Sequence, residues 1–267
     1  MTAVKRFLAI SLLLAAAAVP AVPAPATLAC GGHAVTIEGG PSDDVLVGTA
    51  GNDVISGLGG NDTIRGRGGE DYLCGGPGDD VIIDGPDTDV SFAAYLDGGP
   101  GDDALYPNSF SEAWGGDGND SFSFVRGDHR FHGGPGRDTV RARASTVAVT
   151  IDLRPDPAEG AGIVYSSLGL AWLYDVENAI GSQYDDEITG NFGRNVLQGL
   201  AGDDEIAARG GNDRLFGGSG DDLLFGGNGD DYLHGGAGVG DWLEGDDGTD
   251  TCVDDAFIVG DECEIWP

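Results

Sequence analysis

Basic residues are scarce in this sequence. Lysine and arginine together number 13 against 46 aspartates and glutamates, the formal net charge is −33, and Lys5 is the single lysine. Nucleic acids and anionic membrane surfaces are polyanions, so this charge argues against both as partners and favours cations. The shortage of lysine and the abundance of Ala, Gly and Asp are typical of a high-GC bacterial gene.

The sequence also lacks an apolar run long enough to cross a bilayer, which takes about 20 residues. Its main apolar run, 7–19, follows two basic residues and precedes PAVPAPATLA, a segment of small residues and prolines. This arrangement predicts a secretory signal peptide over 1–29, with cleavage near 24–29. We therefore expect a secreted, extracellular protein without membrane insertion.

Cysteines are few, and all four lie beyond the predicted cleavage region: Cys30, Cys74, Cys252 and Cys263. An even number in an exported chain favours disulfides over metal ligation or catalysis. Three pairings are possible. The placement favours Cys30 with Cys74 near one end and Cys252 with Cys263 near the other.

Catalytic motifs are missing as well. The sequence contains neither H-E-x-x-H nor the G-x-S-x-G nucleophile elbow. The segment HRFH, with His129 and His132, has the spacing of metal ligands, but an exposed edge of an irregular turn explains it more simply. We expect no enzyme and no catalytic residues.

Glycine, by contrast, is abundant, with 49 residues, and from Gly39 it recurs in units of nine. The sixth residue of each unit is Asp, and the eighth is apolar in the first five units. A disordered acidic tract has no reason to keep an apolar residue in step with an aspartate. The units are GGPSDDVLV, GTAGNDVIS, GLGGNDTIR, GRGGEDYLC, GGPGDDVII and DGPDTDVSF, with sixth residues Asp44, Asp53, Asp62, Asp71, Asp80 and Asp89.

A second array begins at Gly181 and runs to 253. It contains one ten-residue unit, GGAGVGDWLE, which shifts the later units by one residue. Its sixth-position residues are Asp186, Asn195, Asp204, Asp213, Asp222 and Asp231, continued out of phase by Asp241 and Asp250.

Between the two arrays the pattern weakens. Only alternate loops survive in 93–141, where GGPGDDALY, GGDGNDSFS and GGPGRDTVR carry Asp103, Asp120 and Asp138. This spacing predicts a one-sided row of aspartates. The repeat disappears over 142–180, where TVAVTIDL alternates as a strand does and GLAWLYDVENAI is strongly apolar. We expect a strand-rich spacer that packs against the repeats and joins their two halves.

The nonamers resemble G-G-x-G-x-D-x-U-x, the pattern of RTX-type (haemolysin-type) calcium-binding repeats. The resemblance covers most of the chain from about 39 to 253. It implies an all-β fold, a parallel β-roll (a right-handed calcium-binding β-solenoid), in which two nonamers form each turn of 18 residues. It also implies that two sixth-position aspartates and several loop carbonyls share each Ca²⁺ ion.

Stacking explains why calcium suits these loops. Strands of successive turns lie about 4.8 Å apart, so sixth-position carboxylates 18 residues apart converge. Calcium accepts six to eight oxygen ligands, including backbone carbonyls, whereas magnesium prefers a strict octahedron and zinc prefers nitrogen and sulfur. The expected rows are Asp44–Asp62–Asp80, Asp53–Asp71–Asp89, Asp186–Asp204–Asp222–Asp241 and Asn195–Asp213–Asp231–Asp250.

The predicted organisation has six parts, and none has the size of a separate catalytic domain. They are the signal peptide (1–29), a first β-roll block with an N-terminal cap (30–92), the one-sided repeats (93–141), the spacer (142–180), the second block (181–253) and a C-terminal disulfide cap (254–267). We expect a non-catalytic calcium-binding protein that folds on binding several Ca²⁺ ions. A surface or matrix adhesin using 142–180 as its contact and an extracellular hydrolase are the alternatives.

Overall fold

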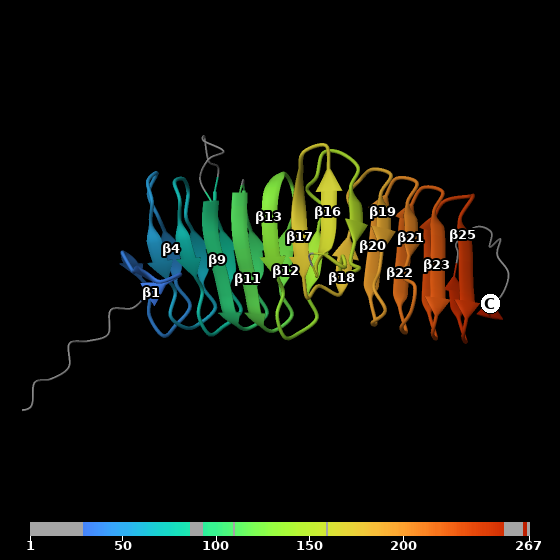
Figure 1. Ribbon diagram of the computed structural model, residues 1–267, viewed down its shortest axis with the longest axis horizontal. Coiled ribbons are helices and arrows are strands. Elements are labelled where there is room, and N and C mark those ends of the chain that lie inside the picture. The colour runs from blue at the N-terminus through green and yellow to red at the C-terminus, as the bar shows by residue number, and fades with distance from the viewer. Residues whose placement is uncertain (1–28, 86–92, 109, 159, 254–263, 266–267) are drawn as a thin grey trace, which may run out of the picture.

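The computed structural model describes residues 29–85, 93–108, 110–158, 160–253 and 264–265. These residues form strands, turns and bends without any helix, in a β-solenoid of about 12 turns. Figure 1 shows the strands stacked side by side along the long axis, from β1 at one end to β25 at the other. The predicted parallel β-roll is thereby confirmed. In the part of the chain described, no helix has the length and apolar character that crossing a bilayer requires.

Two long sheets form the walls of the roll, and strands alternate between them along most of the chain. Sheet 1 contains, in spatial order, β4 (Val45–Val47), β6 (Thr63–Arg65), β8 (Val81–Ile83), β10 (Ala104–Tyr106), β12 (Ser121–Ser123), β14 (Thr139–Arg141), β18 (Asn178–Ile180), β20 (Val196–Ala201), β22 (Arg214–Ser219), β24 (Tyr232–Ala237), β26 (Thr251–Val253) and β27 (Glu264–Ile265). Sheet 2 contains β3 (Ile37–Glu38), β5 (Val54–Ser56), β7 (Tyr72–Cys74), β9 (Ala93–Pro100), β11 (Phe110–Asp117), β13 (Gly127–His132), β17 (Gly169–Tyr174), β16 (Gly162–Ser166), β15 (Thr150–Asp152), β19 (Glu187–Thr189), β21 (Glu205–Ala207), β23 (Leu223–Asn228) and β25 (Trp242–Asp247).

The core is a narrow apolar layer between the two sheets. Within the arrays, parallel partners are 18 residues apart, as in the pairing of Ile64 with Ile82. Because side chains alternate along a strand, the eighth residue of each unit points inward. Leu73, Leu215 and Leu224, for example, are fully buried, whereas the neighbouring Leu223 is 40% exposed. The predicted inward series is therefore confirmed.

The loops depend on left-handed backbone conformations. The fourth-position Gly78 has φ of 141°, and a Cβ there would overlap the Gly60 carbonyl group of the previous turn. The second position is also left-handed, yet Leu58 and Arg209 occupy it with φ of 79° and 82°. Glycine is thus required at the fourth position by close approach, while the second position accepts strain that side chains rarely tolerate.

The spacer lies in the walls of the roll instead of packing against them. β17 continues sheet 2 from β13, after which β16 and β15 form antiparallel pairs and β19 resumes parallel pairing. β18 takes the matching place in sheet 1 between β14 and β20. The two halves are therefore joined by continuous hydrogen bonding through residues 150–180 in both sheets.

A hairpin of β1 (Ala29–Cys30) and β2 (His33–Ala34) lies against the first turns. Cys30 forms a disulfide with Cys74 of β7, as predicted, and the His33 ring lies 4.0 Å from that of Tyr72. Cys252 is disulfide-bonded as well. Its predicted partner, Cys263, lies outside the described residues, as do the signal peptide up to residue 28 and most of the C-terminal cap.

Candidate metal centres

The sixth-position carboxylates link successive turns of the roll. Asp62 Oδ1 accepts a hydrogen bond from the backbone N–H of Asp44, one turn earlier, at 2.8 Å, and Asp80 Oδ1 accepts one from Asp62 at 2.7 Å. The pattern requires each carboxylate to lie directly beside the loop of the preceding turn. The 18-residue period of the sequence and the parallel pairing of three-residue strands place it there.

One row of these side chains, here called row 1, follows the loops that lead into sheet 1 along the whole roll. The sequence predicts three separate stretches, and the structure joins them. Asp80 connects to Asp103 although 23 residues separate them, and Asp138 connects to Glu177 across 39 residues. Row 1 consists of Asp44, Asp62, Asp80, Asp103, Asp120, Asp138, Glu177, Asn195, Asp213, Asp231 and Asp250.

The second row, row 2, follows the loops that lead into sheet 2 and comes in two stretches. Asp53 and Asp71 form the first, and their predicted neighbour Asp89 lies outside the described residues. The second stretch begins at Val149, whose N–H donates to Asp186, and continues through Asp204, Asp222 and Asp241. Asp241 and Asp250 keep their places in the two rows because the extra residue of the ten-residue unit is accommodated in a loop.

The second carboxylate oxygen of most row members is buried and has no hydrogen-bond partner. This holds for Oδ2 of Asp62, Asp80, Asp103, Asp120, Asp138, Asp204, Asp213, Asp222 and Asp231. Buried polar atoms are normally paired, so a set of identical unpaired oxygens calls for a ligand. Among the described residues, both ion pairs lie elsewhere, between His132 and Glu112 and between Arg154 and Asp152.

Each of these oxygens faces a cradle above the first-position glycine of its own unit. A Cβ on Gly226 would lie 2.5 Å from Asp231 Oδ2 and 2.8 Å from the Gly245 carbonyl oxygen. A Cβ on Gly48 would lie 2.7 Å from Asp53 Oδ2 and 2.5 Å from the Gly66 carbonyl oxygen. Glycine thus leaves a small space between a carboxylate and the carbonyl of the next turn, at distances close to the roughly 2.3–2.6 Å of calcium–oxygen bonds.

Burial and mutual repulsion disfavour the charged form of these carboxyls. Burial raises the pKa of Asp103 to about 8, and the nearby carboxylates of Asp120 and Asp80 raise it further against the opposing hydrogen bond from the Asp80 N–H. Burial likewise raises the pKa of Asp138, Asp204 and Asp213 to about 7. A divalent cation in the cradle would reverse this preference by stabilising the ionised form.

The donor set fits calcium. Within the described ranges, no three side chains of His, Cys, Asp or Glu converge on one point, so backbone carbonyls must complete any site. Calcium accepts such carbonyls readily, whereas structural zinc sites use cysteine and histidine. Asn195 is the exception in row 1, because its amide carries no charge and donates to the Glu177 carbonyl oxygen at 2.6 Å.

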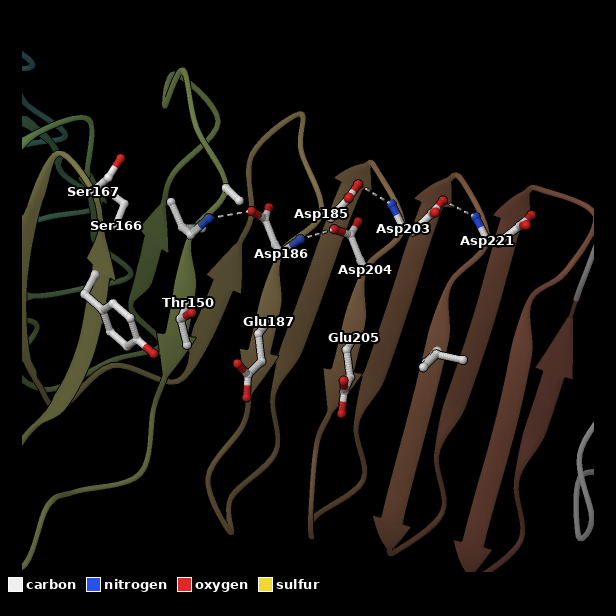
Figure 2. Close-up of a pocket in the computed structure, with 14 residues that line it drawn as sticks. Thr150, Ser166, Ser167, Asp185, Asp186, Glu187, Asp203, Asp204, Glu205 and Asp221 are labelled. Atoms are coloured by element: carbon white, nitrogen blue, oxygen red, sulfur yellow. Dashed lines mark hydrogen bonds between the residues drawn. The ribbon is translucent and has the colours of Figure 1, made fainter.

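An outer row, which the sequence analysis missed, runs beside each metal row with the opposite polarity. Asp185 Oδ1 accepts the N–H of Asp203, and Asp203 Oδ1 accepts the N–H of Asp221, each at 2.9 Å. Figure 2 shows this line outside Asp186 and Asp204. The signal is the frequent Asp or Asn at the fifth position of the nonamers. These side chains hold turns together without facing the cradles.

The two candidate histidines of HRFH do not form a site together. His129 is buried between the sheets near Phe122 and Phe124, where burial lowers its pKa to about 4 and its Nε2 bonds the Arg126 carbonyl oxygen. His132 lies on the outer face, stacked between the rings of Trp114 and Tyr174. Three residues along a strand place two side chains on opposite faces.

Comparison with known proteins agrees with this geometry. A family model of the RTX calcium-binding nonapeptide repeat, in four copies, matches residues 38–73, 47–82, 70–93, 180–215 and 207–240. No curated protein matches the chain. The matched ranges contain the regular parts of rows 1 and 2, so the chain belongs to the proteins built on RTX calcium-binding nonapeptide repeats.

Proposed function

We propose that this is an exported, non-catalytic protein that folds or rigidifies when it binds several Ca²⁺ ions along the two rows. The observation that carries the proposal is the set of buried Oδ2 atoms without hydrogen-bond partners, each beside a glycine cradle. A structure that buries so many carboxylates side by side needs a cation to compensate for their desolvation and repulsion.

The residues divide the work between them. Aspartates such as Asp204 and Asp222 reach back to the previous turn through Oδ1 and present Oδ2 to the cradle, while the first-position glycines keep the cradle open. Bound calcium would supply positive charge between two turns. Because the rows form only when the turns stack, the free energy of binding becomes free energy of folding.

Export fits the affinity expected of such sites. Extracellular calcium modules bind at about 10⁻⁴–10⁻³ M, a range that separates the outside of a cell from the cytoplasm. The predicted signal peptide and the Cys30–Cys74 disulfide both favour an oxidising, extracellular location. Under this proposal the chain leaves the cell unfolded and folds where calcium is available.

The test is a calcium titration of residues 30–267, stripped of metal and followed by far-UV circular dichroism. We expect a cooperative gain of β-signal with calcium and a much weaker response to magnesium. Asp213→Asn should move the midpoint to higher calcium, whereas Asp117→Asn, at an exposed position outside the rows, should not. Full β-structure in excess chelator, or a chain that stays disordered in calcium, would refute the proposal.

An adhesive role for the spacer is a second candidate, supported by an apolar hollow on its outer face. The hollow, of about 540 Å³, is lined by Trp172, Ile163, two prolines and Phe192, which is 77% exposed. Deleting 142–180 would remove strands from both sheets, so point variants are the sharper test. Trp172→Ala and Phe192→Ala should abolish binding to a cell surface while leaving the calcium titration unchanged; retained binding would exclude this surface.

A further inference from the structure

The repeat pattern is absent at the junction where β14 meets β18, yet row 1 passes through it. The parallel pairing of Thr139 with Asn178 places Glu177 one turn after Asp138. Glu177 Oε2 accepts the backbone N–H of Asp138 at 2.8 Å, as sixth-position aspartates do elsewhere in the row. The family match does not extend to these residues.

The loop at this point is shorter than a repeat loop, and its residues compensate for the difference. Only Asp175, Val176 and Glu177 lie between the end of β17 and the start of β18, where a regular unit has six residues. A longer side chain, Glu in place of Asp, therefore reaches the position that the longer loop would have supplied. The Glu177 carbonyl in turn accepts the Asn195 amide and so continues the row.

The junction also contains the cradle. A Cβ on Gly133 would contact both Asp138 Oδ2 and the carbonyl oxygen of Asp175. The Asp175 carbonyl thus takes the place of the first-position glycine carbonyl in regular turns. Asp175 adopts a left-handed conformation, with φ of 52°, which Asp tolerates better than most residues.

An unpaired buried oxygen points into this cradle. Asp138 is fully buried, and its Oδ2 has no hydrogen-bond partner. The nearest arginine, Arg137, uses its guanidinium to bond the Arg194 carbonyl and the Asn178 side chain. The cradle therefore offers negative charge and a carbonyl without a cationic side chain bonded to Asp138.

We propose that Asp138, Glu177 and the Asp175 carbonyl hold a calcium ion at the junction, so that the row of ions continues through the spacer and couples the two repeat blocks. This inference rests on the proposed calcium-dependent folding. It predicts that the spacer responds to calcium directly, although its sequence contains no repeat.

Hydrogen exchange followed by mass spectrometry tests the inference locally. In the wild type, peptides covering 133–141 and 175–181 should gain calcium-dependent protection, about tenfold at a calcium concentration ten times the dissociation constant. Glu177→Gln keeps an acceptor for the Asp138 N–H but removes charge, and Gly133→Ala fills the cradle. Both variants should lose this protection while peptides covering 204–233 keep theirs.

Glu187→Gln is the matched control, because it removes the same charge from an exposed side chain of the next block. It should behave as the wild type. Blocks that respond to calcium around a junction that does not, or Glu177→Gln behaving as Glu187→Gln, would overturn the junction site alone. A wild type in which no peptide responds to calcium would instead overturn the proposed function.

Discussion

Without calcium, protons should take over part of the role of the cation, so the metal-free chain should be most stable in acid. The carboxyls of rows 1 and 2 have pKa values raised above the ordinary 3.8, to about 7 for Asp138 and about 8 for Asp103. The folded state therefore binds protons that the unfolded state has already released. Stability falls as pH rises from about 4 to about 8, because the unfolded chain holds fewer protons throughout that window.

The magnitude is large enough to decide whether the chain folds. The shift of Asp138 corresponds to about 4 kcal/mol of lost stability above its folded pKa, at about 1.4 kcal/mol for each pKa unit. Asp204 and Asp213 have pKa values raised to the same level. A few such carboxyls together approach the whole stability of an ordinary domain, roughly 5–15 kcal/mol, so the metal-free roll should unfold at alkaline pH.

The assay is far-UV circular dichroism of calcium-stripped protein between about pH 4 and about pH 8, with a parallel series in excess calcium. We expect β-signal that decreases with rising pH in the stripped protein. In calcium the decrease should disappear, because deprotonated carboxylates bind the ion better at high pH. A stripped protein whose β-signal is independent of pH, or grows as pH rises, would refute the reasoning.

Two further predictions concern the frame of the roll. Replacing Cys30 and Cys74 together by Ser opens a bridge with a sequence separation of 44 and should cost about 4 kcal/mol, measured by urea unfolding in calcium; an unchanged midpoint would show that the cap adds no stability. Leu215→Ala should cost about 2–5 kcal/mol because its side chain is fully buried, while Leu223→Ala, 40% exposed, should cost clearly less; equal losses would contradict the inward assignment of the eighth position.

Within the arrays, local sequence and its period were sufficient to predict both fold and site. An apolar eighth residue and an aspartate at the sixth recur every nine residues, so strand, inward face and carboxylate position follow from one unit and its neighbour 18 residues away. Asp62 and Asp213 therefore lie where the pattern places them, each with its Oδ2 buried. The opposite faces of His129 and His132 follow from the same alternation, which the sequence analysis did not apply to them.

Only the tertiary structure decided how the two blocks are joined. The link between Asp138 and Glu177 depends on pairing between strands 39 residues apart, across a hairpin whose register no local repeat specifies. The same pairing places spacer strands in both sheets and makes row 1 continuous. A nine-residue pattern determines what repeats, since each unit meets an identical neighbour. Where the pattern lapses, backbone hydrogen bonding and side-chain reach between distant segments select the register, and these exist only in the folded chain.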